Sequence, residues 1–510
     1  MAIEENANYA EELRRLLQIE ELQGLLKGST GPFTIRQLFI NEYLQYVGLH
    51  SSNPQHFLEE ACSVKKYNPE KLILFFKTIL SNCLFKKSNV MKHIDVLILS
   101  RDRTVKVRTK RGELTGDYIF FSIVEFLKTN CPDIMFEIVQ RNDLHFGYEN
   151  SRLRDLGKAI AFGIIKKIQW LMHRRSVLSA IRAEGGSRAD SCIEYFFSIR
   201  PLIRQFLYSY DSANMLSSLD PKIILANDDC LYTKPVIWRG LSMLILQSAG
   251  MAEALEECRS LVFEDEALLP DYYLSSGSYF ADIKRRHHIA RNVITTGLPR
   301  YDVLHDAPFV YSRDAFFREH RIDPGRKMLF WATQLHVMSP EENSAAVKAI
   351  LGALKELEDV ILVIKQHPAE GDEHSSFLKD MINEYNSDAI LVPKTSDTYE
   401  LLSVCDLHIA RTSTTAREAV AMNKPVIILY LEGQDDRLEY VKEGVALGVN
   451  SSAKLKDTIA SLLEDDSRLR ENRNRYIEKY LYKIDGKATE RVVKLMIEML
   501  HREWTRRDTE

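Results

Sequence analysis

Residues Asp406–Leu429, with the sequence DLHIARTSTTAREAVAMNKPVIIL, contain two short apolar runs separated by a hydroxyl-rich turn and a helical segment. The first run ends at Ala410, Ser413–Thr415 form the turn, and the second run begins at Pro425. Buried strands of this length that alternate with helices are typical of a parallel sheet covered on both faces. The stretch therefore predicts an α/β fold.

Other apolar runs extend this pattern in both directions. One sheet is predicted from strands at 328–331, 360–364, 389–392, 406–410 and 425–430. An earlier series predicts another sheet, with strands at 93–100, 134–139, 222–226, 260–263, 272–274 and 292–295. The segment 300–324, rich in Pro, Asp and aromatic residues, is the expected linker. Because ligands of such sheets bind at the carboxyl ends of the strands, we expect a site in the cleft between the two units.

Length and composition agree with several domains. The 510 residues are enough for two or three domains, and the 45% apolar content gives each of them a core. We predict a helical extension at 1–90, a Rossmann-like unit at 91–305, a second such unit at 306–485 and a final helix at 486–510. The 7 cysteines include no Cys-x-x-Cys pair, which predicts reduced thiols in a cytoplasmic protein. We expect neither a secretory signal nor a membrane span, which would need roughly 20 apolar residues.

Two strand ends in the second unit carry residues suited to anion binding. Ser413–Thr415 precede a helix whose first N–H groups can bind phosphate oxygens. Thr415 and Glu418 also fit a capping box, in which they only satisfy each other's backbone donors, so both interpretations stay open. Lys365 and His367 follow another strand, and a cation at the mouth of a buried strand needs an anion or solvent. A single histidine such as His367 is equally often a packed or surface residue.

Two further segments lie at expected strand ends. In Thr296–Asp302, TGLPRYD, the Gly and Pro fix a turn that would hold Arg300 at the junction of the two units. Thr333 and Gln334 end the first strand of the second unit, in the segment WATQ. We therefore expect these side chains near the same cleft.

The order of these motifs resembles that of a known group of enzymes. Thr-Gly-x-Pro-Arg-x-Asp, Lys-x-His-Pro and Ser-Thr-Thr-x-x-Glu-Ala occur in this order in GT-B glycosyltransferases of the surface or capsular polysaccharide type. Their relatives include CDP-glycerol glycerophosphotransferases, polysialic acid synthases and UDP-N-acetylglucosamine 2-epimerases. The resemblance implies the GT-B fold, with two facing Rossmann-like domains, the first for the acceptor and the second for the nucleotide donor. The segment 485–491, DGKATER, implies that the final helix crosses back to the first domain.

The resemblance also implies roles for individual residues. Glu418 would hydrogen-bond the ribose, the turn at 413–415 would receive the diphosphate, and the stretch 392–395 would contact the base. The full set of implied donor-binding residues is Arg300, Thr333, Gln334, Lys365, His367, Arg411, Ser413, Thr414, Thr415 and Glu418.

The chain departs from the family pattern in the first unit. Many relatives carry Gln-His-Gly after a strand there, where this chain has VFEDE at 262–266. Glu264 or Asp265 would then replace the histidine, since a carboxylate can act as the general base for an acceptor hydroxyl. An acidic surface loop is an equal interpretation, and Asp229, after another strand, is the other candidate. The segment 247–250, QSAG, is similar to the triplet, but the helical pattern around it argues against that alignment.

The resemblance implies a transferase that moves a sugar or a polyol phosphate from a nucleotide-activated donor to a surface-glycan or lipid-linked acceptor. No cofactor beyond a nucleotide-sugar or CDP-polyol co-substrate is expected, and no metal, because the sequence has no His-x-x-x-His motif and no cysteine pair. A UDP-sugar 2-epimerase is an alternative, although its His-Arg-Arg-Glu-Asn segment is missing. A non-catalytic GT-B-like partner protein is the third interpretation.

The segment 152–204 is strongly basic, with eleven Lys and Arg against four Asp and Glu. Its part 157–175 predicts a helix with basic ends that is rich in Ile, Trp and Met. Such a helix suits an anionic lipid acceptor or the inner face of the cell membrane, although a core helix with solvated charges has the same composition. A pI near 6.4 and the lack of a nucleic-acid motif argue against nucleic-acid binding.

Overall fold

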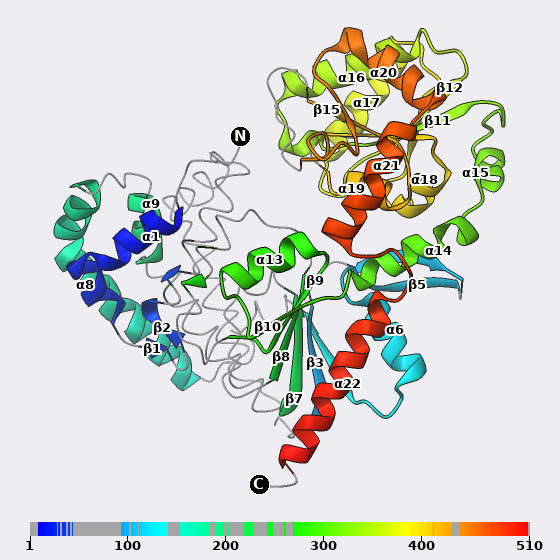
Figure 1. The fold of residues 1–510 in the computed structure, drawn as a ribbon. Coiled ribbons are helices and arrows are strands. Elements are labelled where there is room, and N and C mark those ends of the chain that lie inside the picture. Colours follow the sequence, from blue (N-terminus) through cyan, green and yellow to red (C-terminus); the bar gives the residue numbers. More distant parts are fainter. Residues whose placement is uncertain are drawn as a thin grey trace.

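The computed structural model describes two α/β units and a group of helices beside the first of them (Figure 1). The described residues are 9–27, 93–100, 104–110, 112–140, 153–183, 189–197, 219–227, 242–247 and 269–507 except 412 and 431–438, together with short pieces between 29 and 43 and single positions at 202, 257, 260 and 261.

The first unit holds a parallel sheet of six strands in the order β10-β9-β8-β7-β3-β6. All residues of β3 are buried, as expected for an apolar strand covered on both faces. The chain places β6 on one side of β3 and β7 on the other, so the sheet has its switch point between β3 and β7. The strands are β3 Ile94–Ser100, β6 Phe136–Gln140, β7 Pro221–Asn227, β8 Ser242–Leu246, β9 Tyr272–Ser275 and β10 Asn292–Thr295.

The second unit repeats this arrangement with the strand order β13-β12-β11-β14-β15-β16. Its switch point lies between β11 and β14, which pair in parallel although two strands separate them in the chain. Alternate residues of β11 enter different apolar cores, which shows that helices cover both faces of the sheet. The strands are β11 Lys327–Ala332, β12 Val360–Lys365, β13 Ile390–Val392, β14 Leu407–Ala410, β15 Val426–Leu429 and β16 Leu447–Val449.

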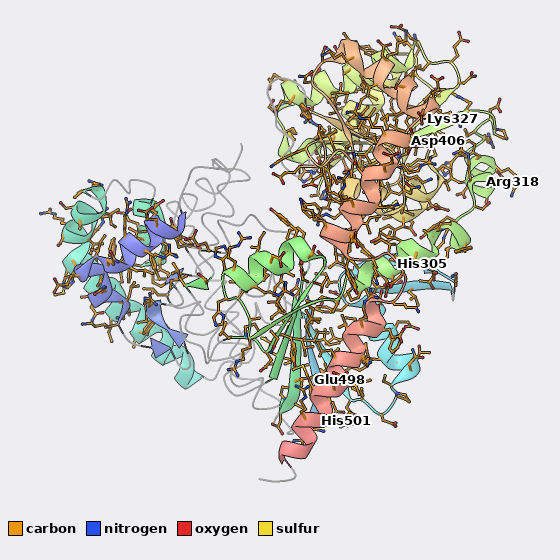
Figure 2. All side chains as sticks on the ribbon, in the orientation of Figure 1. His305, Arg318, Lys327, Asp406, Glu498 and His501 are labelled. Carbon is orange, nitrogen blue, oxygen red and sulfur yellow. The ribbon has the colours of Figure 1, made fainter. Side chains whose placement is uncertain are left out.

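Side chains fix the amino ends of β11 and β14 and the start of the helix that follows β11. At the amino end, Asp406 accepts a hydrogen bond from the Met328 N–H at 2.7 Å, and the Lys327 ammonium lies 3.8 Å from the same carboxylate (Figure 2). After β11, Ser339 and Glu342 form a capping box that starts the next helix, α16. The helices of this unit are α15 Arg313–Glu319, α16 Pro340–Leu354, α17 Asp372–Glu384, α18 Thr398–Val404, α19 Thr415–Ala421, α20 Ser452–Glu464 and α21 Ser467–Tyr476.

The end of the chain crosses back to the first unit. A π-helix, η5 Ile477–Leu481, leads to α22 Ala488–Arg507, which lies along the first sheet (Figure 1). The Asp302 carboxylate accepts hydrogen bonds from the N–H groups of Ala488 at 2.9 Å and Thr489 at 2.8 Å, which fixes the start of α22. The apolar face of α22 then shares a core with β3, β7 and β8. Asp302 itself begins α14 Asp302–Val310, directly after η3 Pro299–Tyr301.

The amino-terminal helices pack against a long helix that the chain inserts between β6 and β7. The Lys166 ammonium donates to the backbone oxygens of Leu25 at 3.0 Å and Lys27 at 2.9 Å, and the Trp170 ring stacks on Phe197 at 5.1 Å. Of the helices described here, none is both long and apolar enough to cross a membrane. The elements are α1 Tyr9–Gln18, α2 Glu20–Leu26, β1 Ser29–Thr30, β2 Phe33–Thr34, α8 Leu153–Ala183 and α9 Ala189–Phe196.

Several sequence expectations for the first unit are wrong. Residues 242–246, expected to be helical, form β8, whereas Ser260, expected to begin a strand, is helical and Leu261 lies in a turn. The antiparallel pair β4 Thr104–Thr109 and β5 Gly112–Asp117 was not predicted from the sequence. The remaining helices of this unit are α6 Phe121–Asn130 and α13 Ser278–Arg286.

Candidate functional site

Polar side chains gather at the carboxyl ends of β11, β12 and β14, around the switch point of the second sheet. Lys365 is the last residue of β12, and its backbone oxygen accepts a hydrogen bond from the Thr333 N–H at 3.0 Å. Both residues are buried, at 8% and 1% exposure. The next residue, Gln334, leads into the short helix η4 Leu335–Val337. The structure therefore brings Thr333, Gln334 and Lys365 to one edge of the sheet.

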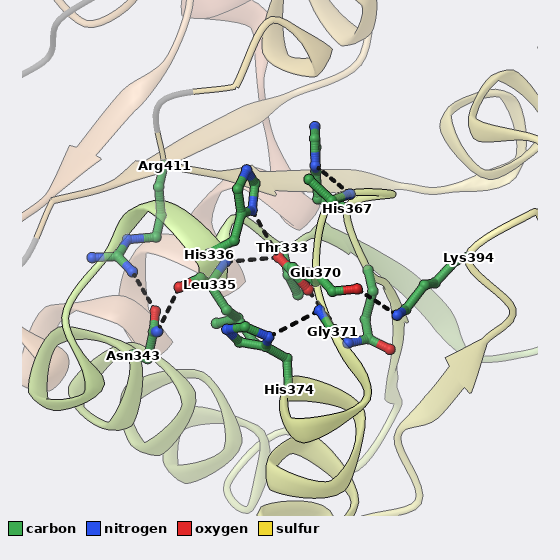
Figure 3. A network of polar contacts seen from close by, with 12 residues as sticks. Thr333, Leu335, His336, Asn343, His367, Glu370, Gly371, His374, Lys394 and Arg411 are labelled. Carbon is green, nitrogen blue, oxygen red and sulfur yellow. Dashed lines mark hydrogen bonds and ion pairs between the residues drawn. The ribbon is translucent and has the colours of Figure 1, made fainter. Parts of the chain in front are cut away.

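A buried carboxylate that the sequence motifs did not indicate joins the loops after β11 and β12. The side chain of Glu370 is completely buried. It accepts hydrogen bonds from the Thr333 hydroxyl at 2.7 Å and from the Leu335 N–H at 2.7 Å (Figure 3). The Lys394 ammonium donates to the Glu370 backbone oxygen at 2.5 Å, so the stretch expected to contact the base joins the same group. Buried carboxylates need such donors, because an isolated buried charge is very costly.

Two histidines stand above this carboxylate. The rings of His336 and His367 stack with centroids 4.4 Å apart and planes inclined by 22°. The Nδ1 atom of His367 accepts a hydrogen bond from the Ala369 N–H at 3.1 Å. His367 was expected here from the sequence, whereas His336 was not, because it lies outside the recognised motifs.

Arg411 follows β14 and faces the same loop from the other side of the switch point. Its Nη1 donates to the Asn343 Oδ1 at 3.4 Å, and the Asn343 Nδ2 donates to the Leu335 backbone oxygen at 2.8 Å (Figure 3). Burial lowers the pKa of the Arg411 guanidinium from its ordinary value, and the Glu342 carboxylate partly offsets this effect. A mostly buried cation at this place favours an anionic ligand.

The hydroxyl turn is held from below by a buried histidine. The Thr415 hydroxyl lies 2.8 Å from the Ser413 hydroxyl and 3.1 Å from the His408 Nε2, and the His408 Nδ1 lies 3.0 Å from the Phe330 backbone oxygen. Burial lowers the pKa of His408 to about 4, so the ring is neutral at pH 7. Helix α19 begins at Thr415, and its N-cap is Thr414, which makes no capping hydrogen bond through its side chain. The capping box with Thr415 as the N-cap is therefore not formed.

Arg300 and Glu418 form a separate group where the two units meet. The Arg300 guanidinium lies 4.5 Å from the Tyr118 ring of the first unit and 4.7 Å from the Tyr301 ring. Arg300 and Glu418 are each only 4% exposed, and they interact electrostatically. The structure therefore brings these two residues together, but it shows Arg300 packed among tyrosine rings, apart from the loops of Lys365 and His367.

The three acidic candidates of the first unit, Asp229, Glu264 and Asp265, lie outside the described residues. Asn227, two residues before Asp229, is the buried last residue of β7 at the first switch point. Gln247 directly follows β8, and its Oε1 accepts hydrogen bonds from the Ser275 hydroxyl at 3.1 Å and the Ser276 N–H at 2.9 Å. The helical pattern used to discount the segment 247–250 is thus wrong, because a strand precedes it.

Within the described part of the chain, no three or more His, Cys, Asp or Glu side chains are grouped as a metal ion would require.

Comparison with known proteins supplies a family. Residues 238–498, slightly more than half of the chain, match a family model described as CDP-glycerol:poly(glycerophosphate) glycerophosphotransferase. No curated protein sequence matches the chain.

Solved structures with similar folds include a wall teichoic acid polymerase, TagF, at 13% identity, with 92% of this chain and 99% of that chain covered and a TM-score of 0.45. A UDP-GlcNAc 2-epimerase from Neisseria meningitidis bound to UDP-GlcNAc is 13% identical over 79% of this chain and 100% of that chain, with a TM-score of 0.49. The S. aureus MnaA–UDP co-structure is 16% identical over 79% of this chain and 95% of that chain, with a TM-score of 0.43.

Proposed function

The chain belongs to the CDP-glycerol:poly(glycerophosphate) glycerophosphotransferase family, and from this premise we propose that it transfers a polyol phosphate, or a sugar, from a nucleotide-activated donor to a surface-glycan or lipid-linked acceptor. The observation that supports this proposal is the polar group at the second switch point, where Lys365 and His367 lie at the carboxyl end of β12 and Arg411 at that of β14, on either side of β11. Ligands of doubly wound sheets bind at this place, and cationic and N–H groups suit a diphosphate. The reaction would serve the synthesis of a capsule or another cell-envelope polymer.

In the polyol-phosphate reaction, the acceptor oxygen attacks the phosphorus that carries the polyol. A new phosphorus–oxygen bond forms, the bond to the bridging oxygen breaks, and the nucleoside monophosphate leaves with that oxygen. Lys365, Arg411 and the hydroxyls of Ser413, Thr414 and Thr415 would stabilise the charge on the leaving phosphate, and Thr333 and Gln334 would line the same edge. The roles that we propose for these residues do not involve a metal ion.

The proton of the acceptor hydroxyl goes to a base, which we place among the carboxylates Asp229, Glu264 and Asp265. Of the three, Asp229 comes two residues after the end of β7, at the switch point of the first sheet. Replacing each carboxylate in turn by its amide identifies the base among them. Replacement of the true base should lower turnover and leave nucleotide affinity unchanged.

The test of the donor proposal is a binding panel of CDP, UDP, GDP and CMP with their sugar or polyol conjugates. A cytidine nucleotide is expected to raise the melting temperature, since a tight ligand of the folded state stabilises it by mass action. The Glu418→Ala variant is expected to lose most of this shift. Its unliganded melting temperature is the control, because Glu418 also interacts with Arg300 at the junction. Wild-type protein that binds none of these nucleotides would refute the proposal.

The alternatives predict other products. A 2-epimerase would release N-acetylmannosamine and UDP from UDP-N-acetylglucosamine without any acceptor. A non-catalytic partner would bind a nucleotide and turn over no donor. Transfer of a radiolabelled polyol phosphate to a polymer acceptor distinguishes the proposed reaction from both.

We also propose that helix α8 holds the protein against an anionic membrane that carries the acceptor. Five large apolar side chains on this helix are exposed, namely Ile164 at 44%, Ile165 at 54%, Ile168 at 52%, Leu171 at 60% and Met172 at 73%. Their spacing of three, four and seven residues puts them on one face of the helix. Exposed arginines at 174 and 175 continue this surface, as in helices that lie in the interface of a bilayer.

Vesicle sedimentation tests this membrane contact. Wild-type protein is expected to bind vesicles that contain phosphatidylglycerol and to bind neutral phosphatidylcholine vesicles far less. Leu171→Glu should release it, because a carboxylate replaces an exposed apolar contact without disturbing the core. Leu171→Ala is the matched control, because it removes apolar surface area without adding a charge. Equal binding of the wild-type protein and Leu171→Glu to anionic vesicles contradicts the proposal.

A further inference from the structure

Several side chains hold the backbone beside the stacked histidines His336 and His367. Leu335, the residue before His336, is held at both of its peptide groups: its N–H donates to Glu370 at 2.7 Å, and its backbone oxygen accepts from Asn343 at 2.8 Å. Asn343 is in turn bonded by Arg411 at 3.4 Å. The backbone next to His336 is therefore fixed by residues from the loops after β12 and β14 and from helix α16.

The support of His367 determines where its proton lies. Because its Nδ1 accepts the Ala369 N–H at 3.1 Å, the neutral ring carries its proton on Nε2. An Nε2–H group is a good donor to a phosphate oxygen, provided that the ring keeps one orientation. The ring of His336 lies against that of His367 with nearly parallel planes, and such contact restricts rotation of either ring.

The environment of His336 itself is not that of a packing residue. Its side chain is 24% exposed, and its Nδ1 lies 3.7 Å from the Glu370 carboxylate. Within the described part of the chain this buried nitrogen makes no hydrogen bond. A leucine would fill a similar volume but has no planar ring to lie against His367, so the property of His336 that matters here is its ring.

We propose that His336 is a positioning residue of the donor site. By stacking, it keeps the imidazole of His367 in the orientation in which Nε2–H donates to a phosphate oxygen of the nucleotide donor. This inference rests on the proposed function, because it takes the ligand of the site to be a nucleoside diphosphate or its polyol conjugate.

The test measures CDP binding by titration calorimetry in a double-mutant cycle. His336→Ala is expected to weaken CDP binding by about three- to tenfold, the range expected from the loss of one aromatic stacking contact. His336→Phe keeps a stacking ring and should restore affinity to within about twofold. In the background of His367→Ala, the change His336→Ala should have almost no further effect, because the ring that it positions is gone.

The unliganded melting temperature of each variant reports folding. If His336→Ala does not fold, His336→Gln, which keeps a polar chain of similar length, takes its place in the cycle. A merely structural role would lower the melting temperature and would weaken CDP binding equally with and without His367.

The outcomes separate the two proposals. Wild-type protein that binds neither CDP nor any other nucleotide overturns the proposed function. Wild-type protein that binds CDP while His336→Ala binds it equally well overturns the role of His336 alone. Additive effects of the two substitutions also overturn it, because His336 would then act independently of His367.

Discussion

Acid should destabilise the second unit through a single buried histidine. His408 lies in the middle of the second sheet with no exposed surface, and its Nε2 accepts a hydrogen bond from the Thr415 hydroxyl. Burial lowers its pKa to about 4 from an ordinary value of 6.5, and the hydrogen bond to the Phe330 oxygen opposes this only in part. In the unfolded chain the same imidazole binds a proton already near pH 6.5. Unfolded protein therefore binds more protons than folded protein between these two values.

The sign and size of the effect follow from this difference. The stability contributed by neutral His408 is fully present above pH 6.5 and is lost as the pH falls toward 4. A difference of about 2.5 pKa units, at about 1.4 kcal/mol per unit, corresponds to about 3 kcal/mol. Protonation of Nε2 also removes the acceptor of the Thr415 hydroxyl, so the turn at 413–415 should loosen over the same range.

Urea unfolding of the wild-type protein and of His408→Asn, followed by tryptophan fluorescence to which the buried Trp331 of the second unit contributes, measures this contribution. Asparagine can still donate to the Phe330 oxygen and does not titrate, so other acid-sensitive groups cancel in the comparison. His408→Asn should be the less stable protein at pH 7.5, and its deficit should shrink by roughly 1 kcal/mol per pH unit between pH 6 and pH 4.5. Parallel stability curves for the two proteins over this range would show that His408 does not titrate on unfolding, and the reasoning would fail.

Three substitutions outside the candidate site test the packing of the chain by their effect on the unfolding free energy. Gly277→Ala would put a Cβ 2.4 Å from the backbone carbon of Tyr480, which cannot move aside, and should cost at least about 2 kcal/mol. Gly352→Ala is the contrasting change, since its Cβ would come no closer than 4.0 Å to another residue, and alanine in helix α16 should add up to about 1 kcal/mol. Arg473→Met removes one of the two arginines that pair with the largely buried Asp466, while Arg470 stays 2.9 Å from it, and should cost about 2 kcal/mol; equal melting of this variant and the wild type would contradict that.

The sequence predicted the second sheet well for a physical reason. Strands such as β12 Val360–Lys365 are continuous apolar runs, because helices cover both faces of a parallel sheet. In the first unit, β8 was missed, since its residues Ser242–Leu246 include Leu and Met, which favour helices as readily as strands, and only the neighbouring strands decide. The hairpin of β4 and β5 was missed because its residues are mostly polar and its faces are largely exposed.

The residues of the candidate site also divide into those that could be predicted from the sequence and those that could not. Lys365, His367 and Arg411 could be named from the sequence, because each lies at or shortly after the end of an apolar strand. Glu370 and His336 could not, because their importance comes from contacts between loops that are distant in the chain. No local pattern distinguishes a buried carboxylate that joins two loops from an ordinary surface glutamate.

The position of β8 also changes the interpretation of the missing histidine. The resemblance implies Gln-His-Gly after a strand of the first unit in many relatives, and the residues that follow β8 are Gln247-Ser-Ala-Gly250. The glutamine and the glycine are thus present in a segment that follows a strand, while serine and alanine stand between them. Gln247 is bonded to Ser275 and Ser276, and the Ser276 hydroxyl donates to the Tyr480 backbone oxygen at 2.8 Å, so the glutamine contributes to the contact between the units. The segment has no imidazole, so under the proposed function we place the proton acceptor at another strand end. The neighbouring strand β7 is followed by two aspartates, which makes Asp229 a stronger candidate than the carboxylates that come after helical Ser260.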